Sequence, residues 1–229
     1  MKHNYSNLVV FDFCETIVSK QTANNFINFI AERNKTKWSR IIGKLEYFLT
    51  QTRFFAIVDR MYPKLNLSKK INLLKIRGLI EVDLKTYANK YYKDFIVKNY
   101  NQVIIDAMKM YLSKNDSLVV IASGGYNPYL EIFCKEFNIY HLFSSKIECN
   151  NSKVTGFYDG EDCMFEEKVK QLNSFIEINK LTFSNKIVYS DSISDLPLFK
   201  WSDIRYVISY NKSQNWPSTY DYNEIIINQ

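Results

Sequence analysis

Histidine is scarce in this chain, since only His3 and His141 occur among 229 residues. So few imidazoles leave little room for a Ser-His-Asp triad or for a metal site built from histidines. The four cysteines stand at unrelated spacings and include no Cys-x-x-Cys pair, so they indicate neither a zinc site nor a disulfide framework. Carboxylates must therefore carry any acid-base or metal chemistry.

Long apolar runs are also absent. A membrane helix needs roughly 18 apolar residues in a row, and no stretch of the sequence comes close to that length. The first residues, MKHNYSNL, lack the apolar centre of a signal peptide. We therefore expect a cytoplasmic protein with no membrane partner.

The charge is only mildly unbalanced, with 30 Lys and Arg against 24 Asp and Glu. This surplus suits a small anionic substrate, but it is too dispersed along the chain to predict a nucleic-acid partner. With 46% apolar residues, the chain can bury the core of one ordinary domain with an inserted subdomain. Nothing in the sequence predicts an oligomeric state.

Four apolar, β-branched segments end at a polar or glycine break and are typical of buried strands. These segments are NLVVFDF (7–13), SLVVIASGG (117–125), SNKIVYSDS (184–192) and IRYVISY (204–210). The first three end in polar clusters, at Asp12, Ser123 and Asp191. Because the carboxyl ends of parallel strands line one crevice, the pattern predicts an α/β, doubly wound parallel sheet with a ligand site at that edge.

Roughly a hundred residues with helical spacing and no strand pattern separate the first two strands. We expect helices at 22–34, 39–51, 67–80 and 83–100, and a helix returning to the sheet at 101–116. This insertion is too long for a simple crossover, so residues 21–98 are predicted to form a helical cap, with 1–20 and 99–229 as the α/β core. A short hairpin is expected within 144–162, with turns at Asn150-Asn151 and Asp159-Gly160.

Four motifs follow one another along the chain: VVFDFCETIV (9–18), VVIASGGY (119–126), EEKVKQL (166–172) and VYSDSISDLP (188–197). In order and spacing they resemble the motifs of the haloacid dehalogenase (HAD) superfamily, and most closely its phosphoserine-phosphatase-like branch. That branch has Asp-x-Asp-x-Thr, Ser-Gly-Gly, a lysine in a Glu-Lys-Val run, and Gly/Ser-Asp-Ser-x-x-Asp. The resemblance covers residues 8–203 and implies a Rossmann-like core with a helical cap after the first strand.

The resemblance implies a Mg²⁺-dependent phosphatase that hydrolyses a small phosphate monoester. Asp12 would be the nucleophile that becomes an aspartyl-phosphate, although an aspartate at a strand end can also cap a helix. Asp191 would hold Mg²⁺ together with Asp12 and the backbone carbonyl of Cys14, because Mg²⁺ prefers hard oxygen ligands. Asp195 would support this metal or orient Lys168, unless it caps the helix that follows it.

The remaining motif residues would bind the phosphate. Ser123, Gly124 and Gly125 would surround the phosphoryl oxygens, since glycine lets a backbone approach closely, although Ser-Gly-Gly by itself is an ordinary turn. Lys168 would neutralise the charge that Asp12 and the phosphate bring together. Lys170 competes for this role, but the Glu-Lys-Val pattern favours Lys168.

Cys14 departs from the family pattern, in which this position is an aspartate that acts as general acid and base. A thiol with a pKa of about 8.5 can donate a proton but is a poor base. Three explanations stay open: a weak proton donor assisted by water, metal or substrate; a phosphotransferase that protects its aspartyl-phosphate from water; or a catalytically impaired phosphate-binding relative. Glu15, where many relatives have glycine, favours a phosphorylated amino alcohol or amino acid over a sugar phosphate.

A cap inserted after the first motif implies a lid that selects small phosphorylated metabolites. Gln21, Thr22 and Asn24 follow the first motif and could reach the substrate, whereas Thr22 could instead cap a helix. Arg53 and Arg60 in the cap could hold a carboxylate or lie on the solvated face of a helix.

Overall fold

The structure is a computed structural model that describes residues 4–228, so the first three residues of the segment searched for a leader lie outside it. Its main feature is a six-stranded sheet of order β3-β2-β1-β6-β7-β8 in which all neighbouring strands run parallel. The strands are β1 (Asn4–Phe11), β2 (Ser117–Tyr126), β3 (Leu142–Ser145), β6 (Thr182–Ser190), β7 (Ile204–Tyr210) and β8 (Asn223–Ile227). The predicted doubly wound α/β fold is confirmed.

β1 lies at the centre of the sheet because both of its faces are apolar. Val9 and Phe11 join one core cluster, whereas Leu8 and Val10 join a second cluster on the other face. Helices cover both faces, which explains why the strand is a continuous apolar run. α6 (Gln102–Leu112) and α7 (Asn127–Glu136) contribute to the first cluster, and α8 (Glu166–Ile178) and α9 (Leu196–Trp201) contribute to the second.

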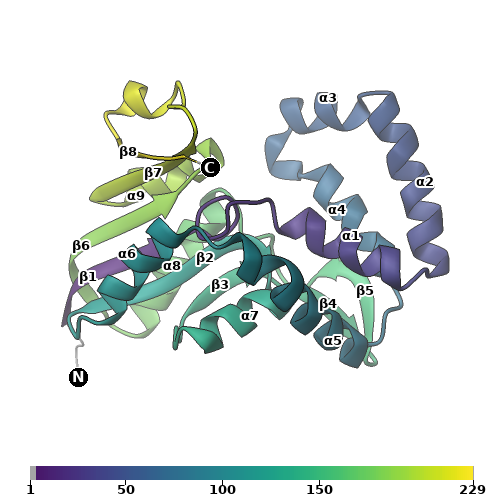
Figure 1. Cartoon of the computed structure of the whole chain (residues 1–229), viewed down its shortest axis with the longest axis horizontal. Helices are drawn as coiled ribbons and strands as arrows, with labels where there is room; N and C mark the ends of the chain where they lie inside the picture. Colours follow the sequence, from purple (N-terminus) through teal and green to yellow (C-terminus); the bar gives the residue numbers. More distant parts are fainter. Residues whose placement is uncertain (1–3, 229) are drawn as a thin grey trace.

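The segment between β1 and β2 is helical and extends to one side of the sheet (Figure 1). Its elements are α1 (Ala23–Arg33), α2 (Lys37–Gln51), α3 (Phe54–Met61), η1 (Pro63–Leu65), α4 (Leu67–Leu73), η2 (Leu74–Ile76), α5 (Glu81–Tyr91), the π-helical turn η3 (Tyr92–Ile96) and η4 (Val97–Asn99). The helical content agrees with the prediction for this segment, although α3 was not among the expected helices. The cap boundaries at residues 21 and 98 stay a prediction.

The inner part of this helical segment shares its core with the sheet. Phe26 of α1 packs edge to face against Tyr129 of α7, with ring centroids 5.0 Å apart. Tyr91 of α5 packs against the same tyrosine at 5.5 Å. These rings belong to the cluster that contains Val9 and Phe11, so burial of aromatic area fixes α1 and α5 beside the sheet.

β4 (Ile147–Asn150) and β5 (Lys153–Tyr158) form the expected antiparallel hairpin. Its turn residues are Asn151 and Ser152, both with positive φ, one position later than predicted. Asparagine tolerates this left-handed conformation, and two such residues give the turn that matches strand twist. Short 3-10 helices, η5 (Ile193–Asp195) and η6 (Pro217–Tyr220), complete the fold. Within residues 4–228, none of the helices has the length and apolar character needed to cross a bilayer.

Candidate active site

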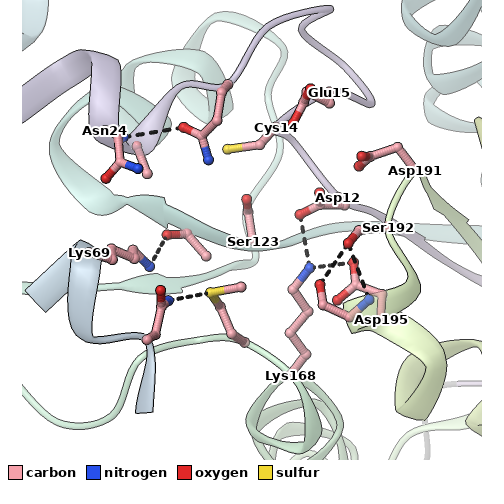
Figure 2. Close-up of a pocket in the computed structure, with 16 residues that line it drawn as sticks. Asp12, Cys14, Glu15, Asn24, Lys69, Ser123, Lys168, Asp191, Ser192 and Asp195 are labelled. Carbon is pink, nitrogen blue, oxygen red and sulfur yellow. Dashed lines mark hydrogen bonds and ion pairs between the residues drawn. The ribbon is translucent and has the colours of Figure 1, made fainter. Parts of the chain in front are cut away.

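The polar ends of three adjacent strands meet at one edge of the sheet. Asp12 follows β1, Ser123 lies near the end of β2, and Asp191 follows β6, which pair side by side in the order β2-β1-β6. All three residues line one cavity of about 160 Å³, shown in Figure 2. The cavity is also lined by Cys14, Glu15, Gln21, Ala23, Asn24, Asn66, Lys69, Gly124, Met164, Lys168, Ser192, Ser194 and Asp195. The structure thus brings together every predicted site residue except Gly125, which follows in β2.

Lys168 is held between two carboxylates (Figure 2). It enters from the first turn of α8, and its Nζ lies 2.9 Å from Asp12 Oδ1 and 2.7 Å from Asp195 Oδ2. Ser190 Oγ donates a further hydrogen bond of 2.6 Å to Asp195 Oδ2. Asp195 makes no side-chain capping bond to α9, so its observed contacts are those of a residue that orients Lys168. Lys170, the competing lysine, is exposed and pairs with Glu167 outside the cavity.

Burial and mutual repulsion perturb the acids of the site. Burial alone would lower the pKa of Lys168, but Asp12 and Asp195 outweigh it and raise that pKa, so the lysine stays charged. Burial raises the pKa of Asp12; Lys168 opposes this shift and Asp195 adds to it. The pKa of Asp191 is raised well above its usual range by removal from water, then by repulsion from Asp12 and Glu15. The lining of the cavity thus holds more carboxyl groups than lysines, in little water.

This excess fits a divalent cation. Between residues 4 and 228, no three His, Cys, Asp or Glu side chains are arranged as a metal-binding group on their own. The predicted set is smaller, with the carboxylates of Asp12 and Asp191 and the backbone carbonyl of Cys14, and Mg²⁺ commonly completes such a set with waters and substrate oxygens. A bound cation would relieve the repulsion that raises the pKa of Asp191. Asp195, predicted as a further ligand, is already engaged by Lys168.

The glycines of the Ser-Gly-Gly segment are required by close packing. A Cβ on Gly124 would lie 2.7 Å from Met164 Cγ, and one on Gly125 would lie 2.6 Å from the hydroxyl of Tyr129. The N–H of Gly125 donates to Ser123 Oγ at 3.1 Å, which leaves the hydrogen of the serine hydroxyl for another acceptor. Ser123 is fully buried and lines the cavity, so a phosphoryl oxygen is a suitable acceptor.

Cys14 lies at one end of a chain of hydroxyl groups. Its Sγ is 2.6 Å from Thr22 Oγ1, which is 3.0 Å from the hydroxyl of Tyr129. Removal from water, followed by repulsion from Asp12, raises the pKa of the Cys14 thiol. Thr22 makes no capping bond to α1, so its contact with Cys14 replaces the helix-capping role considered from the sequence.

Lys69 is the main site residue that the sequence did not reveal. It comes from α4 of the cap, and its Nζ lies 2.6 Å from the carbonyl oxygen of Gly124 and 3.3 Å from Ser145 Oγ. It also forms an ion pair of 2.5 Å with Asp162. The sequence did contain an indication of this role. Lys69 stands four residues before Leu73 and so lies on the same buried face of α4, where a lysine is unexpected.

Among the cap residues considered from the sequence, Gln21 and Asn24 line the cavity. Arg53 and Arg60 are exposed and do not line it. The cap therefore supplies amides and a lysine to the cavity, but not the two arginines.

Comparison with known proteins identifies the family of this chain and proteins that it resembles. Residues 9–200 match the haloacid dehalogenase-like hydrolase family. A phosphoserine phosphatase of Lactococcus lactis subsp. lactis (strain IL1403) is 26% identical over 86 residues, which span 38% of this chain and 40% of that protein. The chain thus matches about two-fifths of the length of that relative.

Solved structures show the same fold. A protein of unknown function from Bordetella pertussis Tohama I has a TM-score of 0.80 at 18% identity, over 96% of this chain and 98% of that one. A phosphoserine phosphatase described as a phospho-aspartyl intermediate analogue has a TM-score of 0.63 at 17% identity, over 97% and 93%. The resemblance to the phosphoserine-phosphatase-like branch is confirmed. Because the family match extends over most of its length, this chain belongs to the haloacid dehalogenase-like hydrolase family.

Proposed function

We propose that this protein is a cytoplasmic, Mg²⁺-dependent phosphatase that hydrolyses a small phosphate monoester through an aspartyl-phosphate on Asp12. The observation that carries the proposal is Lys168, whose ammonium lies within 2.9 Å of Asp12 and 2.7 Å of Asp195. A carboxylate fixed beside a buried cation, in a cavity shared with Ser123, suits attack on a phosphate group. Family membership and a relative named phosphoserine phosphatase support the same reaction.

In the first step, an oxygen of Asp12 forms a bond to phosphorus while the bond from phosphorus to the leaving oxygen breaks. Lys168 offsets the charge that the phosphate brings to Asp12, and the Ser123 hydroxyl donates to a phosphoryl oxygen. A Mg²⁺ ion held by Asp12, Asp191 and the carbonyl of Cys14 would supply further electrostatic stabilisation of the phosphoryl oxygens. The leaving oxygen takes up a proton and departs as an alcohol.

Cys14 is the proposed source of that proton. The hydroxyl of Tyr129 accepts a hydrogen bond of 3.1 Å from the N–H of Tyr126, so its own hydrogen is available to Thr22 Oγ1. Thr22 then donates to Cys14 Sγ. This assignment gives each hydroxyl hydrogen an acceptor and leaves the thiol hydrogen free to face the cavity. The raised pKa of the thiol keeps that hydrogen in place until the leaving oxygen takes it.

The second step, hydrolysis of the aspartyl-phosphate, should be the slower one. Water attacks the phosphorus, the bond from phosphorus to Asp12 breaks, and the water loses a proton as inorganic phosphate forms. The Cys14 thiolate left by the first step takes a proton back from solvent, because its raised pKa favours the thiol. The thiol is then a poor base for the attacking water, whose proton passes to solvent instead. The same observation favours a second candidate, a phosphotransferase in which the hydroxyl of another small molecule replaces water as the acceptor.

The cavity limits the substrate. Its volume of about 160 Å³ is below the roughly 300–1,000 Å³ of sites for drug-sized ligands. Glu15 lines it and is exposed, so it places a negative charge next to the leaving group. Lys69 also lines it, but its donors are taken by Gly124, Ser145 and Asp162. A phosphorylated amino alcohol or amino acid, which carries an ammonium, fits this charge better than a sugar phosphate.

The test is a Mg²⁺-dependent screen of phosphoethanolamine, phosphoserine and a hexose phosphate on the native chain and its variants. We expect turnover that disappears in Asp12→Asn, and faster turnover in Cys14→Asp by up to about 10²- to 10⁴-fold, the usual worth of a placed acid-base group. Lys168→Met should inactivate, while the matched control Lys170→Met, on the exposed face of the same helix, should not. Turnover unaffected by Asp12→Asn would defeat the assignment, and a preference for the hexose phosphate would defeat the substrate class. Phosphoryl transfer to added alcohols without phosphate release would select the transferase.

A further inference from the structure

The outer part of the cap exposes an unusual amount of apolar surface. We name residues 35–65, which contain α2, α3 and η1, the distal hairpin. Of the 21 large apolar side chains exposed in the described part of the chain, ten lie in the distal hairpin. They are Trp38, Ile41, Leu45, Tyr47, Phe48, Phe54, Ile57, Met61, Tyr62 and Leu65. Such a concentration on one region of a protein marks an interaction surface.

The spacing of these residues is that of helical stripes. On α2, Trp38, Ile41, Leu45 and Phe48 follow one another at three- and four-residue intervals, so they share one face of the helix. On the adjoining face of α2, Ile42 is buried against the rest of the cap. The exposed stripe therefore lies beside the packed face, and its first residue, Trp38, lies under the guanidinium of Arg77, 5.0 Å from the ring centroid. α3 repeats the pattern with Phe54, Ile57 and Met61.

Nearly all of the net charge of the chain also lies in the distal hairpin. It contains seven basic residues and two acidic ones, a net charge of +5 within a chain whose total is +6. The basic residues are Lys35, Lys37, Arg40, Lys44, Arg53, Arg60 and Lys64. The expectation that the positive surplus is dispersed along the sequence was therefore wrong.

The two acidic residues of the distal hairpin have partners within the cap. Glu46 forms an ion pair with Lys75. Asp59 accepts hydrogen bonds from the N–H of Leu67 at 3.0 Å and from Ser68 Oγ at 2.7 Å. Among the basic residues, Lys64 pairs with Glu166 of α8 at 2.7 Å. No acidic side chain of the distal hairpin itself is left over to offset the other six.

We propose that the distal hairpin docks this protein on the surface of an anionic lipid bilayer, with the apolar stripe of α2 inserted at the level of the headgroups. Helices that lie in a membrane interface combine aromatic and aliphatic residues on one face with flanking Lys and Arg. Figure 1 shows α2 at the edge of the molecule farthest from β6, with α3 continuing from it along the outer side of the cap. This inference goes beyond the proposed function and departs from the expectation that the protein has no membrane partner.

Two other occupants fit less well. In a symmetric dimer through this surface, a net charge of +5 would face the same charge on the second copy. A protein partner is disfavoured because lysine is depleted at protein interfaces, whereas four of the seven basic residues here are lysines. Bilayer surfaces instead attract lysine and arginine alike, by roughly a fivefold gain in binding for each residue near the surface.

The test is co-sedimentation of the full chain with phosphatidylcholine vesicles and with vesicles that also contain phosphatidylglycerol, without substrate. We expect binding only to the anionic vesicles, weakened by salt, and loss of at least about tenfold in binding in a variant with Lys37→Glu, Lys44→Glu and Arg53→Glu. The matched control changes three exposed lysines of the core, Lys135, Lys153 and Lys212, to Glu. It has the same net charge as the distal-hairpin variant and should bind the anionic vesicles more strongly than that variant does.

The apolar stripe is tested in the same way. Phe48→Ser with Ile57→Ser should abolish binding, whereas Tyr140→Ser with Ile178→Ser, which removes exposed apolar side chains of the core, should not. Brominated lipid should quench the fluorescence of Trp38, and this quenching should vanish in Trp38→Phe. Equal binding of all variants, binding to neutral vesicles alone, or a dimer that forms through this surface without vesicle binding would each overturn the proposal. Because no turnover is measured, failure here is distinct from failure of the phosphatase assignment.

Discussion

Lys69 connects the cap to the Ser-Gly-Gly segment of β2, so its removal should loosen the closed site. The side chain is 5% exposed and its partner Asp162 is 14% exposed, which makes this a buried ion pair. Nζ also donates to the carbonyl of Gly124, directly beside Ser123. Lys69→Met keeps the length of the side chain but leaves a buried carboxylate without its cation.

The expected cost is about 3 kcal/mol, the lower end of the range for breaking a buried pair, because Asp162 retains some contact with water. A cost of this size reduces the population of the closed cap about a hundredfold relative to the open one. KM for the phosphate ester should therefore rise and the urea midpoint should fall. Both are measured on the same preparation, by steady-state phosphate release and by tryptophan fluorescence.

A double-mutant cycle with Asp162→Asn separates this pair from its surroundings. The single variants should each be destabilised, while the double variant should recover part of the loss, because no charge is then left buried alone. Strictly additive losses would show that Lys69 and Asp162 do not act on each other. An unchanged KM and midpoint in Lys69→Met would refute the idea that this contact holds the cap closed.

Three further predictions concern single positions. Thr22→Val should lower the free energy of unfolding by about 1–3 kcal/mol, because it leaves the buried hydroxyl of Tyr129 without its acceptor. It should also lower kcat. Thr22→Ser is the control, and equal behaviour of the two variants would count against the hydroxyl chain. Gly124→Ala should weaken phosphate binding, because its Cβ would lie 2.7 Å from Met164, whereas Gly43→Ala, with nothing within 4 Å, should raise the Tm without affecting KM. Burial lowers the pKa of His141, so its contribution to stability is present above pH of about 6.5 and is lost as the pH falls below that value. His141→Gln should lack this loss in thermal unfolding between about pH 5 and 7. A parallel decline of Tm in the native chain and in His141→Gln would contradict the prediction.

The strands were predictable because their apolar runs are local and strong. β7 occurs at the predicted residues, and β1 (Asn4–Phe11) begins and ends earlier than the predicted 7–13. β3 and β8 were missed. β3 is only four residues long and half of it is serine, so its apolar pattern is too short to stand out. β8 pairs only with β7 at the edge of the sheet, and its assignment depends on that partner rather than on its own composition.

The site residues also fall into those that the sequence could predict and those that it could not. Asp12, Ser123 and Asp191 could be placed because each ends a strand, and parallel strands bring their carboxyl ends together. Lys69 could not, since its partner Asp162 lies 93 positions away and nothing local pairs them. The distal hairpin shows the opposite case, because its charge and its spacing are visible in the sequence. Only the packing of the cap shows which apolar residues of α2 stay exposed, such as Ile41 and Leu45, and which is buried, namely Ile42.

The surroundings of Cys14 explain how a thiol can stand where relatives carry a carboxylate. Its neighbours are the hydroxyl of Thr22 and, through it, that of Tyr129, within a cluster of aromatic rings that offers little water. An aspartate at this position would face the same loss of water and the same repulsion from Asp12 that raise the pKa of the thiol. Such a carboxyl group would titrate closer to neutrality than an ordinary aspartate, which is the range in which one group can both donate and accept a proton. In the proposed reaction, these surroundings would therefore suit an acid-base aspartate, and the sulfur atom would restrict Cys14 to proton donation in the first step.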